Sequence, residues 1–163
     1  MPALLPTKGG FTLVELVVVV VIIAILAAVA VPTFRDATDE AEVAAVARQL
    51  NTLAGQAEAY YADKGAWPGN TLPSRFPNDL ANYVSSSAFT GEPLGGKWDW
   101  NGPGNQVGKI GPNVVVQGSL STMQSQAFAE VDTLIDDGDL TTGTVRQFSV
   151  AGHRVLQYIL ADD

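Results

Sequence analysis

An uninterrupted apolar segment near the N-terminus constrains this chain more than any other feature. All of residues 16–31 are apolar, and only Thr12 and Glu15 interrupt the run that begins at Phe11. As an α-helix, residues 11–31 would be roughly 32 Å long, enough to cross the hydrocarbon core of a bilayer. The segment is rich in valine and isoleucine, which favour strands in water. Lipid forces backbone hydrogen bonds to form within the segment, so we predict a membrane helix.

Glu15 is the one charged residue in this segment. A carboxylate alone at the bilayer centre costs about 2.5–3.5 kcal/mol, so a functional role with a partner is the default hypothesis. A cut between Gly10 and Phe11 would create an α-amino group four residues before Glu15. An amine and a carboxylate about 4 Å apart attract by about 4 kcal/mol at an effective dielectric near 20, which can offset the cost of burying both.

Two geometries would satisfy this pair. Within one chain, the first and fifth residues of a helix lie on the same face and can meet. Between chains, the amine of one helix can reach Glu15 of a neighbour that is displaced along its axis. In that second geometry, Glu15 sets the register of helices that are otherwise uniformly apolar. The sequence leaves both geometries open.

The ten residues before Phe11 have the composition of a leader with an unusual cleavage position. They contain one basic residue, Lys8, and end in the pair Gly9-Gly10. An ordinary secretory signal places its small-residue cleavage site after the apolar region, whereas here the small residues come before it. Cleavage there would keep the helix on the mature protein. A basic residue on this side predicts a cytoplasmic N-terminus by the positive-inside rule.

The sequence KGGFTLVEL, followed by an apolar helix and Pro32, resembles the N-terminus of type IV pilins and type II secretion pseudopilins. The resemblance implies that a prepilin peptidase cuts after Gly10 and that Phe11 becomes the N-methylated terminus. It also assigns Glu15 to filament assembly and Pro32 to a helix kink. From the residues alone, Pro32 could equally mark the end of the membrane helix, since proline removes a backbone donor.

The resemblance also implies partners and a location. The mature chain would wait as a single-pass protein of the bacterial inner membrane, in contact with lipid and an inner-membrane assembly platform. Copies of the chain would then polymerise into a periplasmic or extracellular helical filament. No cofactor is required by this role.

The rest of the chain predicts an α+β head on the second half of a long helix. Apolar residues recur at helical spacing through residues 33–62, and Gly65 is the expected stop. A short helix is expected at 77–84, and a helix with Ser121 as N-cap at 121–136, whose apolar face includes Met123 and Leu134. Alternation predicts four antiparallel strands at 97–101, 113–117, 144–150 and 154–160.

The predicted organisation therefore has four parts. Residues 1–10 form the leader, residues 11–32 the assembly helix, residues 33–64 the amphipathic continuation of that helix, and residues 65–163 the globular head. Trp98 and Trp100 share one strand face, and we interpret them as core residues because aromatic area dominates core energetics. Trp67 is interpreted in the same way, as a local core plug.

Two groups of residues in the head are candidates for metal binding or catalysis. The first group surrounds Gly138 and consists of Asp132, Asp136, Asp137 and Asp139. Oxygen-rich turns of this kind can bind calcium. The resemblance to pseudopilins also implies calcium here, because major pseudopilins often hold calcium in a C-terminal loop. The spacing differs from the EF-hand pattern, and the plain alternative is a solvated helix end. His153, the only histidine, is expected to be exposed in a hairpin turn. No nucleophile elbow or zinc-binding HExxH motif is present, so we expect no enzyme.

Composition limits the remaining function classes. The formal net charge is -8, and there is no cysteine. An acidic chain is a poor nucleic-acid binder, and disulfides and thiolate metal sites are excluded. The favoured hypothesis is a structural filament subunit. The alternatives are a minor tip pilin that acts as an adhesion module and, least favoured, a membrane-anchored enzyme.

Overall fold

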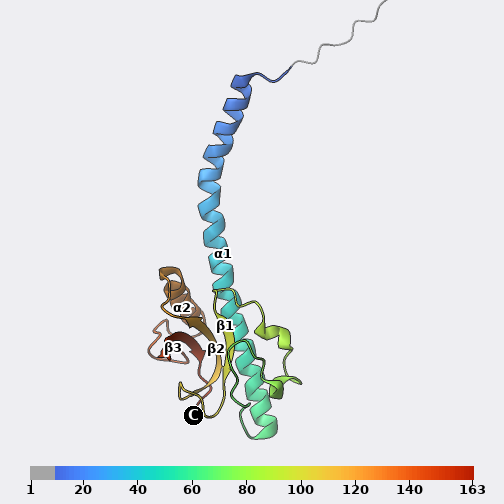
Figure 1. Cartoon of the computed structure of the whole chain (residues 1–163), viewed down its shortest axis with the longest axis vertical. Coiled ribbons are helices and arrows are strands. Elements are labelled where there is room, and N and C mark those ends of the chain that lie inside the picture. Colours follow the sequence, from blue (N-terminus) through green and yellow to red (C-terminus); the bar gives the residue numbers. More distant parts are fainter. Residues whose placement is uncertain (1–9) are drawn as a thin grey trace, which may run out of the picture. The chain divides into compact units, whose positions relative to one another are not determined.

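The computed structural model describes residues 10–163, with only the backbone described for residues 31–36. The predicted leader therefore lies outside the described residues except for Gly10. The chain divides into two compact units, Met1–Thr38 and Asp39–Asp163, and each is considered by itself. The long helix α1, Leu13–Lys64, contributes residues to both units (Figure 1). Gly65 follows its last residue with a φ of 68°, which suits a glycine after a helix, so the predicted helix and its stop are confirmed.

In the first unit, the part of α1 before Ala30 is an apolar helix with exposed side chains. Leu13–Ala30 has a mean hydropathy of 3.2 and is long and apolar enough to cross a membrane. Residues 13–29 are all exposed. Pro32 lies within the helical span, but its side chain is outside the described residues, so its role as a kink stays a prediction.

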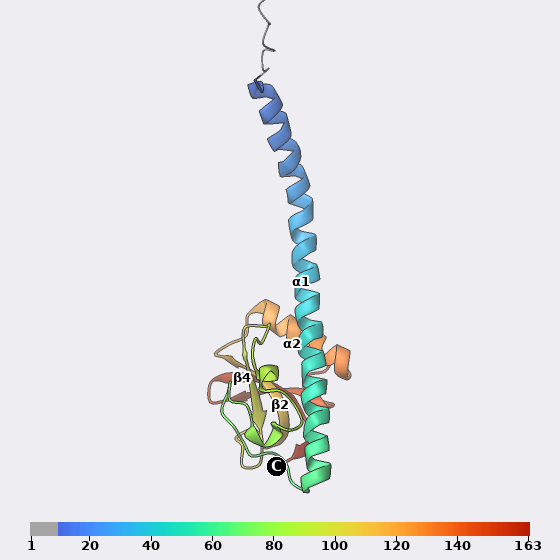
Figure 2. The same ribbon diagram turned by 90° about the vertical axis from the view of Figure 1, so that its right-hand side faces the viewer.

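In the second unit, the same helix buries one stripe against the head. The fully or almost fully buried residues follow the predicted helical spacing: Val43, Val46, Leu50, Leu53 and Ala57. Figure 1 and Figure 2 both show this part of α1 running beside β2. The amphipathic half of α1 is therefore the structural spine of the head.

The head is built on an antiparallel sheet in the order β1-β2-β4-β3, with the short β5 added to β2. Its strands are β1 Lys97–Asn101, β2 Lys109–Gln117, β3 Val145–Val150, β4 His153–Tyr158 and β5 Ala161–Asp162. Trp98 and Trp100 are both buried in the main core, as predicted. The α+β, pilin-like layout expected from the sequence is confirmed.

Three strand predictions need correction. Strand β2 begins four residues earlier than predicted, because Gly111 and Pro112 resemble turn residues but pair with β1. The strand predicted at 154–160 corresponds to β4, which spans His153–Tyr158, and the short β5 at Ala161–Asp162 was not predicted. The hairpin turn is only Ala151-Gly152, with φ of 49° and 80°, as the two-residue type I′ turn requires. His153 therefore starts β4 and is half-buried, not exposed in the turn.

Helix α2, Thr122–Ile135, begins as predicted and buries less than predicted. The Ser121 side chain accepts a hydrogen bond from the Gln124 backbone, and the Gln124 side chain accepts one from the Ser121 backbone, which makes a capping box. Met123 and Leu134 were expected on the apolar face but are 62% and 59% exposed. They lie at the edges of the helix face that Phe128 and Val131 centre, where the head no longer covers them.

The connection between α1 and β1 contains two single-turn helices instead of the one predicted at 77–84. They are η1 Asn78–Leu80 and η2 Ser86–Phe89, and they bury Leu80 and Phe89. Trp67 is half-buried and stacks on Tyr61 with ring centroids 4.4 Å apart.

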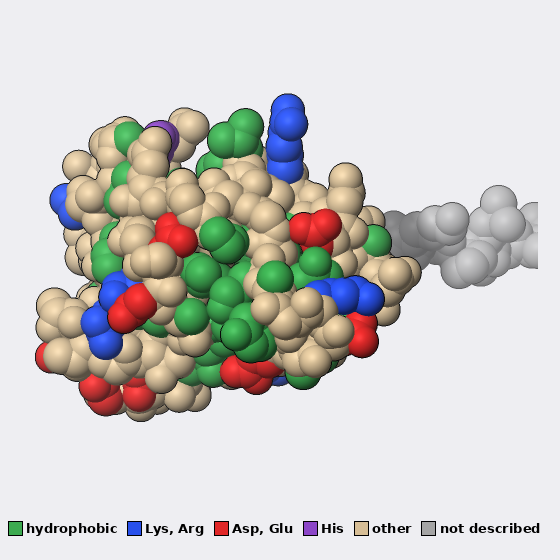
Figure 3. Space-filling model, turned by 90° about the horizontal axis from the view of Figure 1, so that it is seen from below, with side chains coloured by type: hydrophobic (Ala, Val, Ile, Leu, Met, Phe, Trp, Pro, Cys, Tyr) green, Lys and Arg blue, Asp and Glu red, His purple; other side chains and the backbone are tan. Residues whose placement is uncertain are grey.

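Seen from below, hydrophobic side chains gather in the middle of the surface with charged side chains around them (Figure 3).

Candidate assembly site at the start of α1

The first turn of α1 is closed by a reciprocal pair of hydrogen bonds between Thr12 and Glu15. The Thr12 backbone N–H donates to Glu15 Oε2 at 2.8 Å, and the Glu15 backbone N–H donates to Thr12 Oγ1 at 3.2 Å. The Thr12 hydroxyl also donates to Oε2 at 2.7 Å. This is a capping box, in which a threonine and a glutamate three residues apart satisfy the otherwise unpaired N–H groups of a helix start.

Sequence reasoning assigned a role to Glu15 but overlooked Thr12. The signal was present, because Thr-x-x-Glu before an apolar run is the usual sequence form of a capping box. All three hydrogen bonds of this box involve Oε2 or the Thr12 hydroxyl. Within the described residues, Glu15 Oε1 receives no hydrogen bond from the box and is available to a further donor.

Gly10 and Phe11 precede the helix and have few structural constraints. A Cβ built on Gly10 would meet no atom within 4 Å, and Gly10 does not need the left-handed backbone. Phe11 is 85% exposed. Neither packing nor backbone conformation requires a glycine at position 10, so a requirement for glycine there would have to come from another molecule that reads the sequence.

These features define a class of protein: an exposed apolar helix with a capped glutamate at its start, which continues into an α+β head of pilin-like layout. The family model of the prokaryotic N-terminal methylation motif matches residues 5–31. This motif is a class III signal peptide, typical of type IV pilins and pseudopilins. The motif and the apolar helix together support membrane anchoring. No curated protein and no solved structure matches the chain.

The acidic group predicted at the end of α2 is only partly brought together. Carboxylate oxygens of Asp132, Asp136 and Asp137 all lie within 4.8 Å of one another. Asp139 is not part of this group, because its Oδ1 accepts hydrogen bonds from the backbone and hydroxyl of Thr141 at 3.0 Å and 2.6 Å. These bonds lower the pKa of Asp139. Three of the four predicted residues therefore form the compact cluster.

Asp132 is the unusual member of the cluster. It is 0% exposed, and neither of its carboxylate oxygens has a hydrogen-bond partner. Burial, followed by the neighbouring charges of Asp137, Asp136 and Asp139, raises the pKa of Asp132 to about 6. An unpartnered buried carboxylate is costly. Calcium binds six to eight oxygen ligands, and this donor set of carboxylates fits it.

His153 starts β4, where Gln117 of β2 and Val150 of β3 face it. Its Nδ1 is buried and has no hydrogen-bond partner among the described residues. The residue that faces it across the hairpin is Val150, which cannot act as a base or a nucleophile. The methylation motif points to a structural protein.

Proposed function

We propose that this chain is a filament subunit, of the type IV pilus or type II pseudopilus kind, which polymerises through the apolar half of α1. The observation that supports the proposal most is that residues 13–29 are all exposed, with Glu15 as their one charge. Burying a large apolar side chain contributes about 1.5–3 kcal/mol. Lipid covers this surface before assembly, and the helices of neighbouring copies cover it afterwards.

The proposed route begins at the inner membrane. The N-terminus lies on the cytoplasmic side, a prepilin peptidase cuts after Gly10, and Phe11 is methylated. An assembly platform in the same membrane then lifts the subunit into the growing filament. The open surroundings of Gly10 and the exposure of Phe11 are consistent with access by such a peptidase.

Glu15 would align the subunits. The capping box uses Oε2, which leaves Oε1 for the ammonium group of a Phe11 terminus, either in the same chain or in a neighbour. A charged hydrogen bond in a water-excluded environment is stronger than one in water. Because the surrounding surface is uniformly apolar, this single polar contact would fix the axial offset between helices.

The first experiment combines intact mass spectrometry of the mature protein with electron microscopy of the same preparation. The expected mass starts at Phe11 and carries one added methyl group, and filaments are expected in the micrographs. A mass that retains the leader, or that lacks the apolar helix, would contradict the proposal. High abundance in purified filaments separates a main structural subunit from a minor tip pilin.

The second experiment replaces Glu15 with alanine, with Val19→Ala as the matched control in the same helix. We expect Glu15→Ala to leave cleavage and head folding intact and to reduce polymerisation strongly, while Val19→Ala polymerises nearly normally. Filament mass by sedimentation measures the difference. Normal filaments from Glu15→Ala would refute the assigned role of this carboxylate.

We also propose that Asp132, Asp136 and Asp137 bind calcium, because the unpartnered Asp132 carboxylate needs a positive ligand. A ligand at 100 times its dissociation constant stabilises a fold by about 2.7 kcal/mol. Calcium should therefore raise the melting temperature of the full chain in detergent, while magnesium should have little effect. Asp132→Asn should remove the calcium effect, and an equal response in that variant would contradict the site.

A further inference from the structure

The two faces of the head sheet differ in chemical character. The face towards α1 is apolar and includes Trp98, Trp100 and Leu156. The opposite face, called here the outer face, carries buried polar residues on three neighbouring strands: Asp99, Asn101, Asn113 and Gln157. Two valines of this face, Val115 and Val155, are paired across β2 and β4. The outer face is therefore a second, mixed interior and not a solvated surface.

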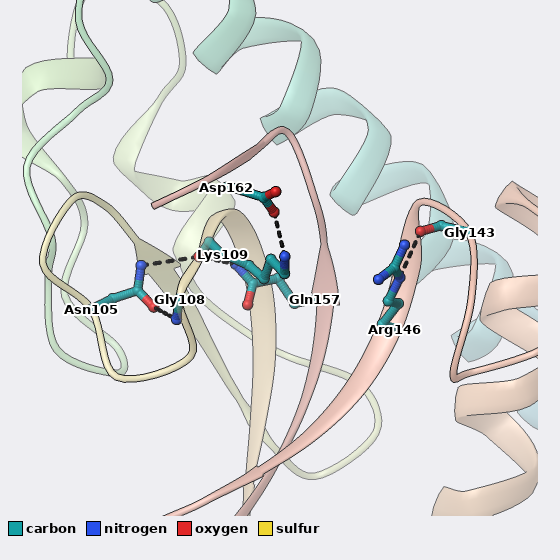
Figure 4. Close-up of polar contacts among 7 residues, drawn as sticks. All are labelled: Asn105, Gly108, Lys109, Gly143, Arg146, Gln157 and Asp162. Atoms are coloured by element: carbon teal, nitrogen blue, oxygen red, sulfur yellow. Dashed lines mark hydrogen bonds and ion pairs between the residues drawn. The ribbon is translucent and has the colours of Figure 1, made fainter.

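Two loops cover the outer face and leave a hollow between them. Residues 70–74 run along the free edge of β1, where Thr71 and Ser74 donate backbone hydrogen bonds to the carbonyls of Trp100 and Trp98 at 3.2 Å and 2.7 Å. The β1–β2 loop is held by Asn105, whose Nδ2 donates to the Lys109 carbonyl at 3.0 Å (Figure 4). The hollow between these loops has a volume of about 290 Å³.

Part of the polar set on this face is hydrogen-bonded within the head. Asn101 Nδ2 donates to Gln157 Oε1 at 3.0 Å, and Gln157 Nε2 donates to the Lys109 carbonyl at 2.8 Å. Lys109 itself forms an ion pair with Asp162 of β5 (Figure 4). This network stabilises the sheet without any ligand.

The neighbouring pair is not satisfied. Asp99 and Asn113 face each other across β1 and β2. Asp99 is 5% exposed and Asn113 is 0% exposed, yet Asp99 Oδ1 and both polar atoms of the Asn113 amide have no hydrogen-bond partner. Burial raises the pKa of Asp99 to about 6, and the Trp100 backbone and the nearby Asn113 side chain, which lies outside good hydrogen-bond geometry, offset only part of that rise. No Lys or Arg in residues 10–163, apart from the undescribed side chain of Arg35, pairs with Asp99.

The missing partner can be deduced from these groups. Buried polar atoms in native proteins nearly always have partners, and a buried carboxylate without a cation is especially unfavourable. Asp99 Oδ1 is an acceptor that lines the hollow, so its partner must donate, and a positive charge would complement the carboxylate, whereas the Asn113 amide, with one donor and one acceptor group, does not line the hollow. Ammonium carries three donors and no acceptor. The paired valines beside these groups supply an apolar floor for an alkyl chain.

We propose that the outer-face hollow binds a primary alkylammonium group, with the nitrogen at Asp99 and the alkyl chain on Val115 and Val155, since these three residues line the hollow. Such a group occurs in free amines and in lysine side chains. This site is separate from the apolar half of α1 and does not depend on the filament role. His153 lines the far end of the hollow, four residues along β2 in register from Asn113.

The test is an NMR titration of the ¹⁵N-labelled full chain in maltoside detergent and phosphate buffer, which contain no competing amine. The probes are n-butylammonium chloride, with 1-butanol and NaCl as neutral and ionic-strength controls. N-acetyl-lysine methylamide and its norleucine analogue form a second pair. We expect saturable shifts at the Asn113 side-chain amide, with half-saturation near 1–10 mM, an ordinary affinity for so small a ligand. Tighter binding of the lysine derivative than of butylammonium would indicate a lysine side chain as the source, and the reverse a free amine.

Asp99→Asn is the decisive variant because it keeps the shape and removes the charge. We expect its affinity for both ammonium probes to fall at least tenfold while the spectrum stays that of a folded head. Glu130→Gln makes the same charge change at an exposed position of α2 and should bind as the parent does. Equal binding by Asp99→Asn, equal shifts with 1-butanol, or no saturation at the concentrations expected would each overturn the proposal, the last indicating that water alone fills the hollow.

Discussion

The two halves of α1 belong to one continuous helix, but they differ in how far their apolar side chains are buried. In the first half, residues 13–29 expose every side chain although nearly all are apolar. In the second half, Val46, Leu50, Leu53 and Ala57 are fully buried within the head. The partners of the second half lie in the same chain, whereas under the proposed function lipid or other copies of the chain would cover the first half. The same type of substitution should therefore affect folding in one half and anchoring or assembly in the other.

The sharpest test of this difference places the same substitution in both halves. Leu50→Ala leaves a cavity in the core and should destabilise the head by about 2–5 kcal/mol. Leu16→Ala removes the same atoms from a side chain that is 60% exposed and should leave head stability unchanged. Thermal unfolding of each full chain in detergent, followed by circular dichroism, measures both. Similar losses in the two variants would show that the halves are not independent.

A charge in the apolar half should produce the opposite pattern. Val20→Asp places a carboxylate within the membrane span, at a cost of about 2.5–3.5 kcal/mol near the bilayer centre. We expect the fraction of the chain that sediments with membranes to fall, with the melting temperature of the head unchanged. Val20→Leu is the control and should stay membrane-bound. An unfolded head in Val20→Asp would break the comparison.

A third test uses the buried carboxylate of the outer face. The pKa of Asp99 is raised to about 6 in the folded head, above the ordinary value of 3.8, so the folded state binds the proton more tightly. Stability should therefore fall as pH rises from about 4 to 6, by roughly 2 kcal/mol, and stay lower above that range.

Asp99→Asn should remove this part of the pH dependence and stabilise the head at pH 7. Asp132 titrates in the same direction, so only the difference between variant and parent isolates Asp99. Urea unfolding at pH 4 and pH 7 gives the measurement. Parallel pH profiles for the two proteins would contradict the assignment.

The smallest expected effect belongs to the capping box of α2. Ser121→Ala removes the side chain that accepts the Gln124 N–H at 3.2 Å and should cost about 1 kcal/mol of head stability. Ser121→Asp restores an acceptor at the helix start and should recover most of the loss. Membrane association should be unaffected in both, and thermal unfolding separates them.

The features predicted correctly from the sequence are those determined by local patterns. The long helix and its stop at Gly65, strand β1 and the Ser121 cap follow from periodicity and cap chemistry over a few residues. Strand β5 and the first half of β2 were missed because only their pairing with each other and with β1 makes them strands. The exposure of Met123 likewise depends on where the head ends, which no local pattern encodes.

The candidate sites divide in the same way. The N-terminal methylation motif is contiguous and was recognised from nine residues. Thr12, the hydrogen-bond partner of Glu15, lies within those nine residues, but its role was overlooked. The acidic cluster was predicted as four residues, and tertiary turns bring together only three. Asp99 and Asn113 could not be paired from sequence, because fourteen positions separate them and only the strand register sets one opposite the other.

The capping box at Thr12 has a consequence for the time before assembly. The Glu15 carboxylate already accepts hydrogen bonds from Thr12 in its own first turn. It therefore does not need water or a neighbouring helix as a donor within the bilayer. Under the proposed function, unassembled subunits can therefore accumulate in the membrane without associating through Glu15. Under the proposed function, assembly of these subunits would start when the ammonium group of an incoming subunit reaches Glu15, so the newly cleaved end of each added subunit would control filament growth.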